Sequence, residues 1–208
     1  MSGSAGADWP EPTWGGTTEA FAEVLSKVRA GDQQAFADLY RALQPRLLRY
    51  LGMRSVDPDD VAADTWLAVV RDLDSFAGDE NAFRAWVFAI ARNRAADAGR
   101  AAGRRPAVPV GDDLELLDQV EGDAAEPVIS AMSTRSALEL VASLPPDQSE
   151  AVALRVLAEL DVAEVAEIMG RSPGAVRVLT HRGLRTLAAR LGDRTAAEEA
   201  SAPSLGEV

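Results

Sequence analysis

The chain contains no cysteine and a single histidine, His181, among its 208 residues. The absence of thiols excludes disulfides, thiolate zinc sites and cysteine nucleophiles, and one histidine argues against a histidine-based metal cluster or catalytic triad. No apolar run approaches the roughly 18–20 residues that span a bilayer, and residues 1–16 lack the pattern of a signal peptide. We therefore expect a cytoplasmic protein without metal, cofactor, catalytic residues or membrane insertion.

Lysine is as scarce as histidine, since Lys27 is the only one, and the net charge is −12. An acidic total argues superficially against nucleic acid, but binding depends on where the charges lie. Residues 170–192 contain five arginines and no acid, and residues 83–105 contain six arginines against Asp97 alone. These two basic stretches keep nucleic acid open as a partner. The preference for arginine over lysine fits a GC-rich genome.

Apolar residues recur at helical spacing along the chain, and no stretch alternates as a strand does. The sequence therefore predicts an all-α protein with two small helical domains. Between them lie seven acids and no basic residue, which is typical of a flexible, self-repelling linker. The predicted parts are a disordered extension at 1–16, a first domain at 17–105, the linker at 106–127, a second domain at 128–192 and a disordered acidic tail at 193–208.

Capping residues and apolar stripes define the expected helices. The predicted N-terminal caps are Asp57 before Pro58, Asp147 with Glu150, and Asp161 with Glu164. In the helix after Asp57, the residues expected to face inward are Val61, Trp66, Val69, Val70 and Leu73. A loop at Ser75–Asn81 precedes a long helix from about Ala82 to Ala102. In the last helix, the expected packing stripe is Val176, Leu179, Leu184, Leu187 and Leu191.

A helix-turn-helix pattern surrounds Gly170, which can adopt the left-handed conformation of a tight turn. Ser172 and Pro173 then start a second helix that is rich in arginine, as in helix-turn-helix proteins that place this helix in the major groove. Arg177 and His181 are four residues apart and so share one helix face. Arginine suits guanine edges or phosphates; the alternative is that these arginines form a solvated helix face.

Four stretches, in order and at family spacing, resemble the extracytoplasmic-function group of bacterial RNA polymerase sigma factors in the sigma-70 family. They are Gly31–Tyr40, similar to the opening helix, Asp59–Trp66, similar to the acidic core motif, Phe83–Asn93, similar to the promoter-melting helix, and Leu144–Leu191, similar to sigma domain 4. The resemblance omits the tails and is loose in the linker. It implies sigma domains 2 and 4 without a central domain, and a source among GC-rich actinobacteria.

The resemblance implies that the long helix and the loop before it read the −10 promoter element as a melted strand. Extruding a base costs about a few kcal/mol of stacking, which a pocket and aromatic faces can recover. Core packing is the alternative for Trp86, because it shares helical spacing with Ile90. The candidate contacts are Phe76, Asn81, Trp86, Arg92, Asn93 and Arg100.

Sigma domain 4 would read the −35 element as duplex. The candidate contacts are Arg171, Ser172, Arg177, Val178, His181, Arg182 and Arg185. Arg171 and Arg190 are expected on phosphates, which position the protein without specifying sequence. Val178 and Leu179 stand where the family often has polar or basic residues, so the preferred bases do not follow from the family.

The resemblance also implies partners. The expected contacts with the β′ coiled coil of core RNA polymerase are Asp59, Asp60, Asp64 and Trp66, and core packing is the alternative for Trp66. The other implied partners are the β flap of the polymerase, promoter DNA and an anti-sigma factor that holds the protein inactive. The acidic linker would thread toward the RNA channel and mimic nucleic acid there.

Two other functions fit parts of the sequence, besides that of a promoter-specificity subunit without catalysis of its own. A free-standing helix-turn-helix regulator explains residues 147–191 but leaves the motifs at Asp59 and Phe83 unexplained. A regulatory enzyme with a DNA-binding tail lacks cysteine, a second histidine and a phosphate-binding glycine loop. The promoter sequence, the regulon, the inducing signal, the identity of an inhibitor and the role of Trp9 and Trp14 do not follow from the sequence.

Overall fold

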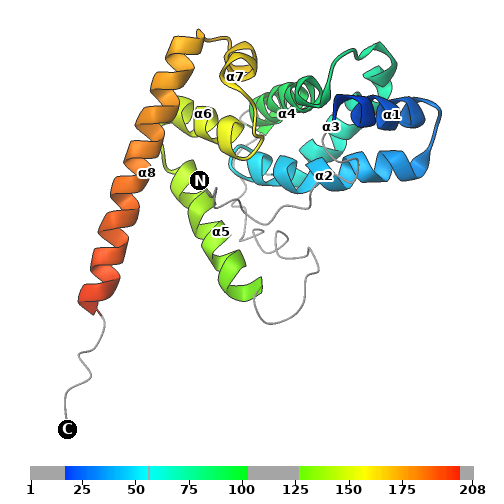
Figure 1. The fold of residues 1–208 in the computed structure, drawn as a ribbon. Helices are drawn as coiled ribbons and strands as arrows, with labels where there is room; N and C mark the ends of the chain where they lie inside the picture. Colours follow the sequence, from blue (N-terminus) through cyan, green and yellow to red (C-terminus); the bar gives the residue numbers. More distant parts are fainter. Residues whose placement is uncertain (1–16, 56, 103–126, 202–208) are drawn as a thin grey trace. The chain divides into compact units, whose positions relative to one another are not determined.

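The computed structural model describes residues 17–55, 57–102 and 127–201 (Figure 1). In these ranges all regular structure is helical, with eight α-helices and one short 3₁₀ helix. The chain divides into two compact units, Met1–Val120 and Glu121–Val208. The prediction of an all-α protein with two helical domains is confirmed. None of the described helices is long and apolar enough to cross a bilayer.

The first unit is built around helix α3, which packs against both α2 and α4, while α1 packs against α2. Its elements are α1 (Thr18–Arg29), α2 (Gln33–Gly52), α3 (Pro58–Asp72), η1 (Leu73–Ser75) and α4 (Glu80–Ala102). Aromatic rings fill much of the core. Tyr50 and Phe88 are fully buried and meet edge-on, with ring centroids 5.4 Å apart. These contacts join α2 to α4.

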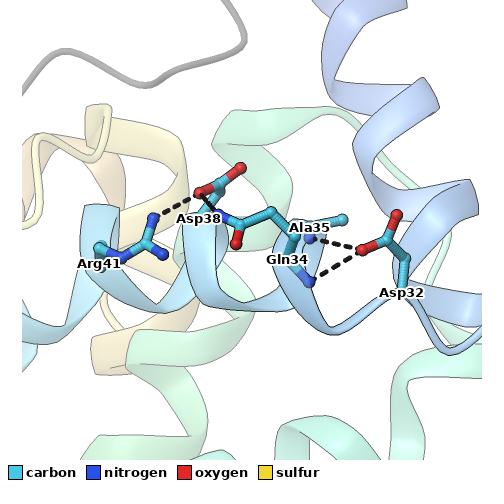
Figure 2. Close-up of polar contacts among 5 residues, drawn as sticks. All are labelled: Asp32, Gln34, Ala35, Asp38 and Arg41. Atoms are coloured by element: carbon cyan, nitrogen blue, oxygen red, sulfur yellow. Dashed lines mark hydrogen bonds and ion pairs between the residues drawn. The ribbon is translucent and has the colours of Figure 1, made fainter.

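Helix α2 begins after Asp32, whose carboxylate accepts hydrogen bonds from the backbone N–H groups of Gln34 and Ala35 at 2.8 and 3.1 Å (Figure 2). One turn further, Asp38 accepts a hydrogen bond from the Gln34 side chain at 3.0 Å and pairs with Arg41. A cap of this kind stabilises a helix by about 1 kcal/mol, whereas an exposed ion pair adds less. The first turn of α2 is therefore stabilised by its own polar residues.

Helix α3 begins as predicted, because Asp57 caps it and Pro58 is its first residue. Four of the five residues expected to face inward are buried, namely Val61, Trp66, Val69 and Leu73. The prediction for Val70 is wrong, since its side chain is 54% exposed. Val70 lies about 100° around the helix from Val69, and this turns it out of the contact with α2 and α4.

The second unit is centred on α6, which packs against α5, α7 and α8. Its helices are α5 (Pro127–Ala142), α6 (Pro146–Val156), α7 (Val162–Met169) and α8 (Pro173–Ser201). The predicted capping box at α7 is confirmed: Asp161 accepts from the Glu164 N–H at 2.9 Å, and the Glu164 carboxylate accepts from the Asp161 N–H at 2.7 Å. Large buried side chains of the core are Val152, Leu154, Leu160, Val165 and Val176.

The predicted cap of α6 is wrong. The helix starts at Pro146, with Pro145 at the capping position and no side-chain cap. Proline is already constrained to the first-turn conformation, and this moves the start ahead of Asp147. Asp147 instead lies in the first turn and pairs with Arg171 at 2.6 Å. Glu150 is buried.

Two predicted boundaries also shift. Helix α4 begins at Glu80, so Asn81 lies in the helix and not in the preceding loop; Asp79 accepts a hydrogen bond from the Ala82 N–H at 2.9 Å. Helix α8 continues to Ser201, past the predicted end of the second domain at residue 192. The stretch from 195 to 200 is rich in alanine and glutamate, which are strong helix formers.

Three predicted parts lie outside the described residues, in whole or in part. They are the extension at 1–16 with Trp9 and Trp14, the linker as far as residue 126, and the tail from 202 to 208.

Candidate nucleic-acid interface

The turn between α7 and α8 has the predicted geometry. Gly170 is left-handed, with φ of 62°, and the Arg171 N–H donates to the carbonyl oxygen of Ala166 at 2.9 Å. Ser172 caps α8, because its hydroxyl oxygen accepts from the Ala175 N–H at 3.2 Å. The predicted start of α8 directly after Ser172 is therefore confirmed.

One face of α8 is open to solvent. It carries five of the predicted contacts, namely Arg177, Val178, His181, Arg182 and Arg185. Within the described part of the chain, no hydrogen bond or ion pair engages the side chains of these three arginines. We call this surface the α8 face. Its donors are available to a polyanion without breaking a contact among the described residues.

The opposite face of α8 is positioned by Gly183, a residue that sequence reasoning missed. A Cβ atom at this position would lie 2.7 Å from Val152 Cγ2 and 3.4 Å from Leu144 Cδ1. Only glycine therefore allows α8 to approach α6 this closely. A glycine inside a helical pattern, which costs about 1 kcal/mol against alanine, was the available signal. Leu184 and Leu191, which were expected to pack, are 46% and 52% exposed because the contact is centred on Gly183.

Arg171, a predicted phosphate contact, is held by an acid of its own chain. Its guanidinium pairs with Asp147 at 2.6 Å, and both side chains are about half exposed. Arg190, the other predicted phosphate contact, donates to the Ser143 hydroxyl. An exposed pair is worth about 1 kcal/mol or less, so a phosphate can replace Asp147 at little cost.

In the first unit, the loop between η1 and α4 is packed by aromatic rings. The ring of Phe76 stacks on Trp86 with centroids 5.1 Å apart and meets Phe83 edge-on at 5.3 Å. Gly78 allows this approach, because a Cβ atom there would lie 2.7 Å from Ala82 Cβ and 3.1 Å from Phe76 Cζ. Trp86 is half-buried, which fits the alternative that it packs. Phe76 likewise packs within the loop, against Phe83 and Trp86.

Three of the predicted −10 contacts share a face of α4. Trp86, Asn93 and Arg100 are seven residues apart, which is close to two helical turns. Asn93 and Arg100 are exposed, and Arg100 pairs with Asp97 one turn back. We call this surface the α4 face.

Asn81 and Arg92 lie apart from the α4 face. At about 100° per residue, both are turned more than 80° away from Asn93 around the helix. Asn81 is exposed and its amide oxygen accepts from Arg84, while Arg92 is half-buried. The structure therefore groups three of the predicted residues and separates these two.

Helix α3 presents the predicted acids but not the predicted tryptophan. Asp59, Asp60 and Asp64 are exposed, whereas Trp66 is only 6% exposed. The Trp66 Nε1–H donates to Gln44 Oε1 at 2.7 Å, which satisfies its one polar group inside the core. Trp66 therefore packs in the core, which was the alternative to a role as a polymerase contact.

Two apolar side chains beside these acids were missed. Leu67 is 69% exposed and Val70 is 54% exposed. Leu67 lies three residues from both Asp64 and Val70, so the three are neighbours on the helix surface. Nearby, a hydrogen bond from Arg71 holds the pKa of the Asp72 carboxyl below its ordinary value. We call the surface formed by Asp59, Asp60, Asp64, Leu67 and Val70 the α3 face.

Two family models match the chain in the order of the two units. The model described as Sigma-70 region 2 matches residues 31–105, and the model described as Sigma-70, region 4 matches residues 134–187. The first match includes the motifs at Asp59 and Phe83, which a free-standing helix-turn-helix regulator left unexplained.

Individual relatives extend over most of the chain. The ECF RNA polymerase sigma factor BldN of Streptomyces coelicolor is 34% identical over 174 residues, which are 82% of this chain and 66% of BldN. The ECF RNA polymerase sigma factor ShbA of Streptomyces griseus is 34% identical over 183 residues, which are 83% of this chain and 95% of ShbA. The solved structure of CnrH in complex with the cytosolic domain of CnrY has a similar fold, with a TM-score of 0.56 at 23% identity over 83% of this chain and 97% of that one.

Proposed function

Because the chain belongs to the extracytoplasmic-function RNA polymerase sigma factors, we propose that it directs core RNA polymerase to promoters by reading two separate DNA elements. The α8 face reads the −35 element as duplex, and the α4 face with its loop reads the −10 element as a melted strand. The observation that carries the proposal is the open α8 face, whose arginines project from a helix that Ser172 and Gly183 fix in place.

The −35 reading follows from the chemistry of the α8 face. Arg177 and Arg182 can each donate two hydrogen bonds to a guanine, and each such pair discriminates against the wrong base by about 1–3 kcal/mol. Val178 lies between them and is 49% exposed, so its methyl groups suit the methyl of a thymine. Arg171, which precedes α8, and Arg190 supply phosphate contacts outside this face.

The residues that the sequence predicts as −10 contacts have different proposed roles. Asn93 and Arg100 are exposed on the α4 face and are the groups proposed to meet the strand. Phe76 and Trp86 stack on each other and shape the loop beside the strand. Asn81 and Arg92 lie apart from the α4 face, so any contact that they make with the strand is outside it.

The α3 face is the proposed contact with the β′ coiled coil of the polymerase. Acids beside exposed Leu67 and Val70 suit a partner helix that offers both basic and apolar side chains. Trp66 supports this face from inside the core without touching the partner. The β flap is the proposed partner of the second unit.

An anti-sigma factor is the proposed inhibitor. CnrH is held in a complex with the cytosolic domain of CnrY in the solved structure of similar fold. A protein that covers the exposed Leu67 and Val70 of this chain would block the same surface that the polymerase needs.

Reconstitution tests the proposal directly. The full chain is combined with core RNA polymerase of Streptomyces coelicolor, the organism of the relative BldN, on fragmented genomic DNA, and transcript start sites are mapped. We expect starts that share two spaced sequence elements and that are absent without the protein. Failure to bind core polymerase, or starts without a shared element, would contradict the proposal.

A further inference from the structure

Arg29, the last residue of α1, reaches a loop more than 40 residues away in the sequence. Its Nε and one terminal nitrogen donate to the carbonyl oxygen of Leu73 at 3.4 and 3.2 Å, and the same terminal nitrogen donates to the carbonyl oxygen of Phe76. These two carbonyls bracket η1: Leu73 is its first residue, Phe76 follows its last, and the Phe76 N–H donates to the Leu73 carbonyl oxygen at 3.1 Å. One guanidinium therefore clamps the beginning of the loop.

The chemistry of the acceptors explains why an arginine is used. The Leu73 carbonyl oxygen lies at the C-terminal end of α3, where carbonyls carry a partial negative charge, and besides the Phe76 N–H it can accept a second hydrogen bond. A cation at this position satisfies them, and a planar guanidinium can serve two acceptors in a fixed arrangement. A lysine ammonium is a single point charge and holds such a pair less rigidly.

The far side of the same loop is held by rings. Phe76 stacks on Trp86 and meets Phe83 edge-on, and Phe83 in turn lies 5.6 Å from Phe21 of α1. Helix α1 thus supports the loop twice, through a buried ring and through Arg29. The ring contact is deep in the core, whereas the Arg29 clamp lies near the surface.

We propose that Arg29 is a positioning residue for −10 recognition: it fixes the loop from Leu73 to Asp79 so that the Phe76–Trp86 stack stays closed beside the melted strand. The inference rests on the proposed function, since it is the role of this loop that gives the clamp a consequence. Arg29 does not contact the strand. Loss of the clamp frees the loop and weakens the choice between bases, while the α8 and α3 faces keep their geometry.

The test uses holoenzyme assembled from the full chain and Streptomyces coelicolor core polymerase on a promoter mapped with the wild-type protein. The variants are Arg29→Ala, Arg29→Lys and, as a matched control, Lys27→Ala, which removes a cation from the same helix where it pairs with Glu23 at the surface. The rate of open-complex formation is measured on the mapped promoter and on versions with single −10 substitutions. We expect Arg29→Ala to lower the ratio of these rates about three- to tenfold, because a charged hydrogen-bonding group is lost. Arg29→Lys should lie between, and Lys27→Ala should match the wild type.

A second readout does not depend on transcription. In the free chain, amide hydrogen exchange from residue 76 to residue 79 should be faster in Arg29→Ala than in Lys27→Ala. Unchanged exchange would overturn the proposal that Arg29 holds the loop.

Other outcomes separate the two proposals. An unchanged rate ratio in an active Arg29→Ala holoenzyme would overturn the inference alone. Equal losses on all promoters, with a lower thermal midpoint or weaker core-polymerase binding, would also overturn it, because they mark a general loss of structure. If the wild-type protein initiates nowhere, the proposed function fails, and hydrogen exchange still decides whether the clamp exists.

Discussion

The two faces proposed to read DNA differ in how their polar groups are engaged. On the α8 face, the side chains of Arg177, Arg182 and Arg185 make no hydrogen bond or ion pair within the described residues. On the α4 face, Arg100 is paired with Asp97, and the aromatic side chain that shares the face, Trp86, is stacked on Phe76. We call the α8 face open, because its arginines are unengaged within the described residues, and the α4 face closed, because Arg100 and Trp86 are engaged by neighbouring side chains.

This difference matches the two forms of DNA that the faces would meet. A duplex presents its groove edges ready-made, so a rigid, open helix face can dock on it at once. A melted strand exists only after bases have been unstacked, at a cost of about a few kcal/mol. A face whose arginine is already paired gains somewhat less from intact duplex, because an exposed pair is worth about 1 kcal/mol or less, and it engages when the strand becomes available. The contrast can be tested at each face separately.

The largest effect is expected from a change beneath the α8 face. In Gly183→Val, the added side chain collides with Val152, since a Cβ atom alone would lie 2.7 Å from its Cγ2. Overpacking of this kind costs about 1–3 kcal/mol of unfolding free energy. Thermal and urea unfolding of the full chain should show this loss, together with loss of −35-dependent transcription.

Gly174→Ala is the control for that change. Gly174 lies in the first turn of the same helix, and the nearest atom to a Cβ there is Ser172 Oγ at 3.9 Å. Alanine should raise the unfolding free energy by about 0.4–1 kcal/mol because it restricts the unfolded chain. Equal stability of Gly183→Val and the wild type would mean that α8 does not depend on this close approach.

The next effect concerns specificity without loss of stability. Arg177→Ala removes one open guanidinium, so discrimination at one base pair of the −35 element should fall by about 1–3 kcal/mol. Competition binding of holoenzyme to promoter variants measures it, with Arg41→Ala as a control in the first unit. Core-polymerase affinity should be unchanged. Loss of both properties would mean that Arg177 is mainly structural.

Val178 should contribute a smaller and more local effect. If it touches a thymine methyl, replacing that one thymine by deoxyuridine removes a buried methyl group worth about 0.8 kcal/mol. Wild-type holoenzyme should therefore lose affinity at one thymine of the −35 element, and Val178→Ala should be insensitive to the same replacement. A uniform response of both proteins at every thymine would exclude this contact.

The second unit was largely predictable because its signals are local. The capping box at Asp161, the left-handed Gly170 and the cap at Ser172 each depend on residues within one turn. Together, the caps and the family motif also predict that the arginines of the α8 face lie on the recognition helix. What failed here depends on tertiary contact: Leu184 has helical spacing with Val176, yet Gly183 takes the packing position because α6 approaches there.

The first unit was less predictable for the same physical reason. An exposed tryptophan and a buried one have the same sequence signal, so Trp66 was a candidate contact until Gln44 and the neighbouring rings placed it in the core. Leu67 and Val70 break the rule that apolar residues face inward, and periodicity cannot identify such exceptions. The contacts of Arg29 could not be predicted for a further reason: its acceptors are backbone carbonyls, which every residue has.

The smallest effect should come from opening the closed face. Asp97→Asn removes the partner of Arg100, and an exposed pair of this kind is worth about 0.2–1 kcal/mol, so holoenzyme should bind the non-template −10 strand up to about fivefold more tightly at low salt. The salt dependence shows the cause. If Arg100 newly meets a phosphate, the slope of log affinity against log salt steepens by about 0.7, the value for one contact on single-stranded nucleic acid. Tighter binding with an unchanged slope would mean only that a repelling charge is gone. In that case Arg100 makes no new phosphate contact when Asp97 is neutralised, so its pairing with Asp97 is not what keeps the α4 face closed, and the contrast with the open α8 face would have to rest on the Phe76–Trp86 stack.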